Sequence, residues 1–156
     1  MFFKKNTALK AYADGKMIPI TEVEDPVFSQ KIMGDGLAIQ PEGNTIYAPC
    51  DGKVTVTFDK TQHAVGIAMK NKMEILLHVG LDTVNLQEEI FHTLVKSGDD
   101  VKQGQTLITY NKERLYELGY SDVTMCVITD EGNAKNVEIL SNGTVKAKET
   151  DIVKYK

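Results

Sequence analysis

The sequence predicts an all-β fold, an antiparallel β-sandwich or barrel with one or two short helices. Short runs of alternating apolar and polar residues recur along the chain, and turn residues such as Gly, Asp and Asn separate them. Two pairs of segments resemble each other, and only one segment has a clear helical pattern. With 156 residues and 42% hydrophobic content, the chain is long enough for one domain, which would bury roughly 68 to 70% of the surface that the unfolded chain exposes.

The internal similarity suggests a fold built by duplication. Residues 11–20 and 48–56 each contain a small-residue approach, an Asp-Gly turn and an alternating strand. Residues 98–108 and 142–153 share a second pattern of turn, short strand, turn and short strand. Recurrence of this kind is typical of a barrel or sandwich with many tight turns.

The chain begins with a loose lead-in over residues 1–9, and residues 10–156 are expected to form the single domain. Pro and Gly punctuate the segment after Val23, where Asp35 lies between two glycines and is expected in a tight exposed turn. The large apolar side chains of this segment are expected in the core: Phe28, Ile32 and Met33.

Residues 61–84 are predicted to form the hairpin that carries the chemistry, because they hold two of the three histidines. Two apolar-rich runs flank the polar residues 70–72, which is typical of a hairpin. A two-residue turn at 70–71 would place His63 opposite His78, with their Cβ atoms roughly 4.5 to 5.5 Å apart. A slip of one residue in this register would send one histidine to each face of the hairpin.

The same register assigns the other side chains of the hairpin to two faces. Thr61 would lie beside His63 on the outward face, opposite Gly80. Apolar residues that flank the histidines would form a rim for a docking protein: Val65, Ile67, Leu76 and Val79. The nearly all-apolar remainder would pack on the core: Ala64, Gly66, Ala68, Met73, Ile75 and Leu77.

Residues 111–118 are the best candidate for a short helix. Asn111 can cap its start, and Gly119 can end it in a left-handed conformation. Leu115 and Leu118 give the helix one apolar edge.

Composition argues against several classes of function. The net charge is −4 with mixed signs, and no basic stripe indicates nucleic acid. Arg114 is the single arginine, so a cluster of arginines that would clamp a phosphate is not available. Cys50 and Cys126 are far apart in the sequence and are expected as buried, reduced thiols. The apolar start is too short for a signal peptide and no run of about 18 apolar residues occurs, so we expect a cytoplasmic protein without membrane insertion.

Two facing histidines are compatible with three roles. The simplest is a hydrogen-bonded pair without a chemical task. The second is a zinc site, but a catalytic zinc needs three protein ligands, and the spacing of Asp82 and His92 does not enforce convergence with the pair. No metal is therefore required, although adventitious zinc could bind at His63 and His78.

The third role is a phosphohistidine relay, which fits the surrounding residues best. A neutral imidazole nitrogen can attack a phosphoryl group, and an unperturbed pKa of about 6.5 leaves its lone pair free near neutral pH. Moderate hydrogen-bond partners such as His63 and Thr61 suit an intermediate that must pass the group on, because a cage of arginines would hold it too tightly. Gly80 leaves room beside the acceptor.

The sequence resembles the glucose-type IIA component of the bacterial sugar phosphotransferase system, an EIIA type 1 domain of that system. The resemblance spans roughly residues 10–156 and is firmest over 23–110. The following segments carry it: Val27-Phe28-Ser29, Gly34-Asp35-Gly36, Ala48-Pro49 with Asp51-Gly52, Thr61-Gln62-His63-Ala64, and Leu77-His78-Val79-Gly80-Leu81-Asp82-Thr83-Val84.

The resemblance implies a duplicated hybrid-motif sandwich and a phosphotransferase that uses no cofactor. His78 would take the phosphoryl group from the phosphocarrier HPr and give it to a cysteine on the IIB domain of a sugar permease. His63 would hydrogen-bond the phosphoryl group, and Thr61 would orient His63. Asp35 and Asp82 would meet an arginine of the carrier. The hairpin by itself does not say which histidine is the acceptor.

The chain departs from the family pattern at two places. The glycine-rich sequence that commonly follows the acceptor strand is replaced by residues 86–91, and Thr-Pro before a late apolar strand is replaced by Thr124-Met125. No cysteine lies in a IIB-like motif, so we expect the sugar-specific domain outside this sequence. The alternative function is a regulatory binding protein whose phosphorylation state controls transporters or metabolic enzymes such as kinases. A zinc hydrolase like the lysostaphin-type peptidases is a further alternative.

Overall fold

The computed structural model describes residues 7–140 and 143–156 and confirms the predicted all-β class. Every strand pair in the described part of the chain is antiparallel. Two short α-helices are present there, α1 (Pro26–Ser29) and α2 (Lys112–Glu117), with two 3-10 turns, η1 (Ile20–Glu22) and η2 (Thr83–Asn85). No helix in this part is long and apolar enough to cross a bilayer.

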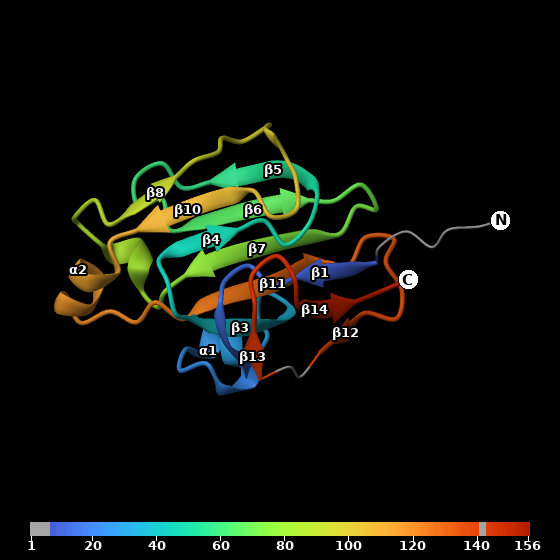
Figure 1. The fold of residues 1–156 in the computed structure, drawn as a ribbon, viewed down its shortest axis with the longest axis horizontal. Helices are drawn as coiled ribbons and strands as arrows, with labels where there is room; N and C mark the ends of the chain where they lie inside the picture. The colour runs from blue at the N-terminus through green and yellow to red at the C-terminus, as the bar shows by residue number, and fades with distance from the viewer. Residues whose placement is uncertain (1–6, 141–142) are drawn as a thin grey trace.

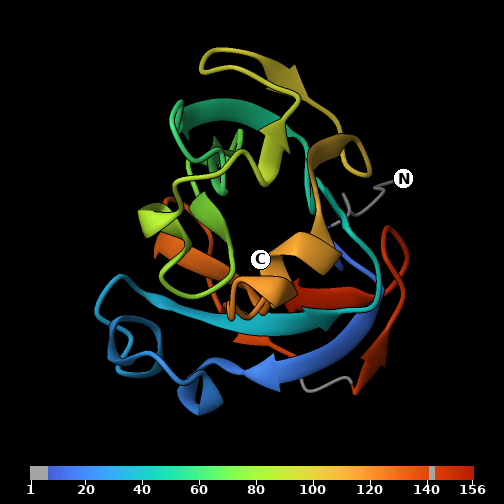
Figure 2. The same ribbon diagram turned by 90° about the vertical axis from the view of Figure 1, so that its left-hand side faces the viewer.

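An eight-stranded sheet forms the main layer, in the order β13-β2-β3-β11-β7-β6-β5-β9. The sheet curls, so that β2 and β5 lie on opposite sides of the molecule (Figure 2). In sheet order its strands are Thr144–Val145, Gly15–Pro19, Asp35–Pro41, Thr124–Asp130, Glu74–Val79, Ala64–Ala68, Gly52–Thr57 and Asp100–Val101.

Two three-stranded sheets complete the structure. One has the order β1-β14-β12, with strands Ala8–Lys10, Asp151–Lys154 and Glu138–Ile139, and the other β4-β10-β8, with strands Thr45–Tyr47, Thr106–Tyr110 and Phe91–Thr93. Of the expected lead-in, residues 1–6 lie outside the described residues. Residues 8 and 9 are not loose, because they pair with β14.

The internal repeats form the predicted elements. A strand follows each Asp-Gly pair, β2 in one case and β5 in the other. Residues 98–108 contain β9 and β10, and the described part of 142–153 contains β13 and β14. Asp35 is exposed as expected, but it starts β3 and pairs with Ile128 instead of lying in a turn.

The predicted helix is present as α2. The Asn111 side chain accepts a hydrogen bond from the backbone N–H of Arg114 at 3.1 Å, which satisfies one of the donors left free at a helix N-terminus. Gly119 follows the helix with φ of 85°, and Leu115 is fully buried. Local sequence was therefore sufficient to define this element.

Most apolar side chains of the described residues belong to one core between the curled sheet and the smaller sheets. A second cluster contains Phe28, Val123 and Met125 and lies under α1. Both expected thiols are buried and free. The expectation for Ile32 and Met33 was wrong, because 65% of Ile32 and 36% of Met33 are exposed after α1.

The β6–β7 hairpin differs from the predicted register by one residue. Ala64 pairs with His78 and Val65 pairs with Leu77, whereas the two-residue turn required His63 opposite His78. The loop contains the three residues 70–72, and Lys72 adopts a left-handed φ of 71°. A three-residue hairpin loop commonly ends in a residue with a left-handed φ. Gly or Asn usually occupies that position, so a lysine there did not indicate a three-residue loop.

The new register reverses the faces of β6. Val65 and Ile67 point into the core with Ile75 and Leu77, and all four are at most 1% exposed. Val79 is also fully buried. Of the predicted docking rim, only Leu76 lies on the outward face with His78, so the assignment of Val65, Ile67 and Val79 to a rim was wrong.

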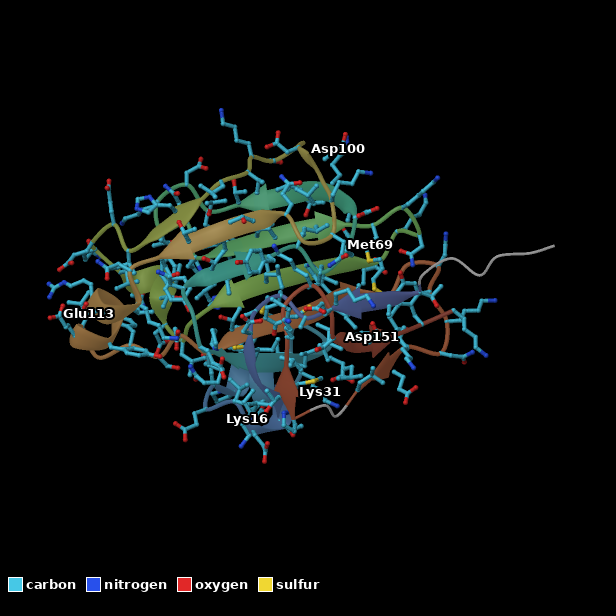
Figure 3. All side chains as sticks on the ribbon, viewed as in Figure 1. Lys16, Lys31, Met69, Asp100, Glu113 and Asp151 are labelled. Carbon is cyan, nitrogen blue, oxygen red and sulfur yellow. The ribbon has the colours of Figure 1, made fainter. Side chains whose placement is uncertain are left out.

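The hairpin runs along most of the long axis of the molecule. Its tip, marked by Met69, lies at the end opposite α2, where Glu113 is labelled (Figure 3). Strand β7 ends near α2 (Figure 1). Residues at the open end of the hairpin, including His78, therefore lie toward the α2 end of the molecule.

Candidate functional site

The His63 and His78 rings meet although the two residues are not paired in the sheet. Their centroids are 4.7 Å apart, and the rings are nearly perpendicular at 83°. His78 lies within β7, whereas His63 precedes β6 and follows Gln62, which has a left-handed φ of 58°. The His63 carbonyl still accepts a hydrogen bond from the Val79 N–H at 2.8 Å. The predicted proximity is thus reached from the residue just before β6, which lies diagonally across from His78 and not directly opposite it.

Thr61 fixes the orientation of the His63 ring. The Oγ1 atom of Thr61 lies 2.6 Å from Nδ1 of His63, and both side chains are buried. Phe58 packs on the same ring, with centroids 5.0 Å apart. With Nδ1 engaged, Nε2 is the nitrogen of His63 left for other partners.

Burial keeps His63 neutral. Desolvation, with a smaller effect of the neighbouring His78, lowers the pKa of His63 to about 4. A neutral imidazole carries a single N–H. If the Thr61 hydroxyl donates to Nδ1, the His63 proton must lie on Nε2, which can then donate to an anion beside His78.

His78 presents one protected and one available nitrogen. Its Nδ1 is buried and has no hydrogen-bond partner of ordinary geometry among the described residues. The ring is only partly buried as a whole, and Phe28 from the residues of α1 packs against it with centroids 5.1 Å apart. The nitrogen open to a docking protein is therefore Nε2.

Burial also lowers the pKa of His78, and several groups oppose this shift. The Gly80 backbone, followed by the carboxylates of Asp25 and Asp82, stabilises the protonated ring. The effect of burial is larger than these opposing effects, so the pKa of His78 stays below its ordinary value. The ring is therefore neutral at pH 7 and its lone pair is free. A neutral, partly exposed imidazole of this kind is a competent nucleophile.

Two acidic residues border His78, and only one of them was predicted. Asp82 and Asp35 were both expected to meet a partner, and both are exposed, but Asp35 lies against Lys31, with 3.5 Å between its Oδ1 and the lysine Nζ. Asp25 takes the second place near the ring. It caps α1 by accepting a hydrogen bond from the Val27 N–H at 2.9 Å. Its position directly before Pro26, a helix-start signal, could have drawn attention to it.

The turn after His78 requires glycine. Gly80 has φ of 84°, and a Cβ at this position would lie 2.4 Å from Cγ2 of Thr83 and 2.7 Å from the Ser121 carbonyl oxygen. The Thr83 hydroxyl donates to the Val79 carbonyl at 2.6 Å, and Asp82 is left-handed with φ of 58°. Space beside the acceptor was predicted for Gly80. In the structure the glycine instead permits a close backbone turn.

Three exposed apolar side chains lie on segments that contact the pair or the turn after His78, and these segments are not the predicted ones. Val84 follows the turn and is 54% exposed, Val27 lies in α1 and is 42% exposed, and Phe58 is 37% exposed beside His63. We call these three residues the apolar rim. None could be found from strand alternation, because they lie on loops or on a helix of four residues.

The remaining polar residues do not converge on the pair. His92 is exposed on β8, and Arg114 forms a two-pronged ion pair with Glu88, at 2.9 and 2.6 Å. Within residues 7–140 and 143–156, no group of three or more His, Cys, Asp or Glu side chains is arranged to hold a metal ion.

Comparison with known proteins gives one consistent family. The sequence profile of the phosphoenolpyruvate-dependent sugar phosphotransferase system, EIIA 1, matches residues 7–134. The chain is 39% identical over 149 residues to the glucose-specific EIIA component of Oceanobacillus iheyensis, which covers 96% of this chain and 90% of the relative. It is 40% identical over 145 residues to that of Mycoplasma capricolum, covering 93% of both chains.

Two further similarities concern domain organisation and fold. The glucoside-specific EIICBA component of Staphylococcus carnosus is 42% identical over 132 residues, which are 85% of this chain but 19% of the relative. The solved structure of glucose permease IIA from Mycoplasma capricolum superimposes with a TM-score of 0.88 at 38% identity, covering 98% of this chain and 97% of the other.

Proposed function

Because this chain belongs to the EIIA 1 family of the phosphoenolpyruvate-dependent sugar phosphotransferase system, we propose that His78 is the residue that carries its phosphoryl group. The chain is a phosphotransferase component of that system, which interacts with HPr and a IIB domain. The observation that carries the residue assignment is the ring pair at 4.7 Å, in which His78 is the more exposed member.

The proposed reaction has two displacement steps. The Nε2 lone pair of His78 attacks the phosphorus of phospho-HPr, the new P–N bond forms, and the bond from phosphorus to HPr breaks. A cysteine thiolate of the IIB domain then attacks the same phosphorus, and the His78 nitrogen leaves with its lone pair. The proton on Nδ1 of His78 stays in place throughout. The ring is therefore neutral before the first step and after the second, and between the two steps it carries one positive charge next to the negative charge of the phosphoryl group.

His63 and Thr61 support the phosphoryl group without trapping it. A phosphoryl group on His78 would lie beside Nε2–H of His63, whose tautomer is set by the Thr61 hydroxyl at 2.6 Å. One neutral donor gives moderate stabilisation, about 1 kcal/mol net. The single arginine is bound to Glu88, so it does not add a stronger clamp. This balance suits a group that must leave again.

Partner docking is assigned to the apolar rim and to the two acids beside His78. Val27, Phe58 and Val84 expose apolar surface on segments that contact the ring pair or the turn after His78, and such surface favours association when a partner covers it. Asp25 and Asp82 add negative charge, which would attract a basic partner and raise the association rate. HPr and the IIB domain would use this surface in turn.

We place the chain in the cytoplasm as one domain over residues 10–156, joined by the strand that starts at Ala8. The sugar-specific domain would be a separate protein or another part of a longer chain, as in the EIICBA relative. The regulator alternative, with transporters or kinases as partners, is not favoured, because these relatives are named as sugar phosphotransferase components.

The decisive experiment maps the label after incubation with radiolabelled phospho-HPr. We expect the label on His78, loss of labelling in H78Q, and unchanged labelling in H92Q, whose histidine is exposed on β8. H63Q should accept the phosphoryl group but donate it poorly to IIB. Intact donation by H63Q to every IIB domain tested would refute the relay role of His63. If no IIB domain accepts the group from the wild-type protein, the regulator alternative gains support.

A further inference from the structure

A fully buried carboxylate lies outside the ring pair and has no part in the reaction described above. Asp122 is 0% exposed. It accepts hydrogen bonds from the hydroxyls of Tyr116 and Tyr110 at 2.6 and 2.7 Å and from Nε2 of Gln40 at 2.7 Å. Nζ of Lys112 lies 3.0 Å from the second carboxylate oxygen. We call Asp122 and these four partners the Asp122 cluster.

The Asp122 cluster is built for a charged carboxylate. Burial alone would raise the pKa of Asp122, but the hydrogen bonds of the four partners outweigh burial and hold that pKa below its ordinary value. Gln40 comes from β3 and Tyr110 from β10, whereas Lys112 and Tyr116 come from α2. The carboxylate therefore fixes the segment just before β11 to three separate elements.

That segment is in direct contact with the turn after His78. The Val123 carbonyl accepts a hydrogen bond from the Gly80 N–H at 2.8 Å. The Ser121 carbonyl oxygen would lie 2.7 Å from a Cβ added to Gly80, so the backbones approach as closely as glycine allows. Both neighbours of Asp122 in the chain thus hold Gly80 between them.

A further contact continues from the same segment into β7. The Thr124 hydroxyl donates to the carbonyl of Asp122 at 2.9 Å, and Thr124 pairs with Val79 in the sheet. The segment that carries the carboxylate is therefore linked to the two residues that follow His78, to Gly80 through Val123 and to Val79 through Thr124. The Gly80 backbone in turn favours the protonated form of the His78 ring and so opposes the lowering of its pKa by burial, while Nδ1 of that ring has no hydrogen-bond partner of ordinary geometry among the described residues.

We propose that Asp122 is a positioning residue for the phosphoryl-accepting histidine. By fixing residues 121–123 against Gly80, it holds the Gly80 carbonyl toward the N–H at Nδ1 of His78, so that the lone pair at Nε2 points out of the site. The proposal rests on the assignment of His78 as the acceptor. It gives the cluster a role in reactivity and not only in folding, because a buried charge held by four partners restricts movement of the turn more than apolar packing would.

The test uses D122N, which keeps the shape of the side chain but replaces one acceptor oxygen with an NH2 group. Because the apolar rim is unchanged, KM for phospho-HPr should stay constant, while kcat for phosphorylation falls by about ten- to a hundredfold through misplacement of the nucleophile. In unphosphorylated protein, 15N-NMR of the imidazoles should show a smaller population of the His78 tautomer protonated on Nδ1.

A destabilised but unrelated variant controls for stability. I152V removes one methyl group from the core of β14, where Ile152 is fully buried, and should cost about 0.5 to 1.5 kcal/mol. It should leave kcat and the His78 nitrogen signals unchanged. If I152V produces the same changes as D122N, or if folded D122N matches the wild type in both readouts, the positioning role is wrong.

Y116F provides the same test if D122N does not fold. Tyr116 is 47% exposed and supplies one of the four donors, so its loss should leave the fold intact and shift the same signals in the same direction by a smaller amount. Unchanged His78 signals in Y116F would overturn the proposal in that case. The NMR readout needs no phosphoryl donor, so a failure of wild-type phosphorylation would count against the acceptor assignment and not against the positioning of the ring.

Discussion

At the scale of single residues, the site depends on keeping two neighbouring imidazoles neutral without a strong positive charge nearby. His63 is 1% exposed, and its burial cost falls on the protonated ring. The Thr61 hydroxyl, at 2.6 Å from Nδ1, satisfies one nitrogen and leaves the other for the phosphoryl group. Protein stability and phosphoryl transfer therefore depend on the same protonation state.

The first prediction concerns stability at acidic pH. The pKa of His63 is lowered to about 4 in the folded protein, whereas the unfolded chain has a histidine pKa of about 6.5. Between these values the unfolded state binds more protons, so the contribution of neutral His63 is fully present above pH 6.5 or so and is lost as pH falls toward about 4. The loss should amount to up to about 3 kcal/mol.

Urea unfolding of the wild type and H63Q from pH 7.5 to 4.5 measures this effect. The difference in the free energy of unfolding between the two proteins should change in favour of H63Q as the pH is lowered, because carboxylates contribute equally to both. A constant difference across this range would show that His63 is not held neutral by burial.

The second prediction concerns the tautomer of His63. T61V removes the donor to Nδ1 but keeps the size of the side chain, so His63 loses the group that fixes its proton on Nε2. Transfer from phosphorylated protein to a IIB domain should slow by about 5- to 100-fold, which corresponds to roughly 1–3 kcal/mol for a lost buried partner. T61S, which retains the hydroxyl, should restore most of the rate. Equal rates in T61V and T61S would contradict this role.

At the scale of elements, local signals located strands and the helix but not the register of the hairpin. The Asp-Gly turns, the cap at Asn111 and the stop at Gly119 are read from neighbouring residues, and the structure confirms these elements. The turn at residues 70–72 depends on distant contacts. The Asn71 carbonyl accepts a hydrogen bond from the Asn133 N–H at 2.8 Å, and no pattern within the hairpin could reveal that contact.

The residues of the site also differ in how far the sequence could predict them, because only some of them lie in one contiguous stretch of the chain. The motifs containing His63, His78 and Thr61 are contiguous and pointed to a common site. Asp25 and the Asp122 cluster are brought to it by the packing of α1, α2 and β11. Side-chain convergence of that kind depends on the tertiary fold, and spacing in a single sequence does not encode it.

The third prediction tests the corrected turn. Lys72 has φ of 71°, a conformation that costs a residue with a Cβ about 1–2 kcal/mol. K72G should therefore raise the free energy of unfolding by about 0.5–1 kcal/mol after the entropy loss of glycine is included. K70G, in the same loop but without a left-handed φ, should lower it by a similar amount. Stabilisation by K70G and not by K72G would restore the two-residue turn.

At the scale of the whole molecule, the buried face of the hairpin and the apolar rim have separate functions. Val65 is fully buried, whereas Val84 is 54% exposed in η2, which follows the turn after His78. The first side chain contributes to folding and the second to the rim that a partner covers. The burial of Val65 follows from the one-residue change in register, whereas the exposure of Val84 follows from its place in η2, outside the hairpin strands.

The fourth prediction separates these two surfaces. V65A should lower the free energy of unfolding by about 1–3 kcal/mol, because the truncation leaves a cavity, while KM for phospho-HPr stays unchanged. V84A should raise KM for phospho-HPr several-fold and leave stability within about 0.5 kcal/mol. Calorimetry and steady-state transfer assays measure both quantities. If V65A raises KM for phospho-HPr and V84A leaves it unchanged, the docking surface must include the face of β6 that carries Val65.

Strands β1 and β14 pair with each other at the end of the molecule away from α2, whereas β7, which carries His78 near its last residue, ends near α2 (Figure 1). A tether attached through either strand would leave on the side facing away from incoming carriers. The same fold can therefore operate as a separate protein or as a domain joined to a permease, because attachment at that end would leave the transfer surface accessible to partners. The relative in which the matching segment is 19% of the length has such a fused arrangement.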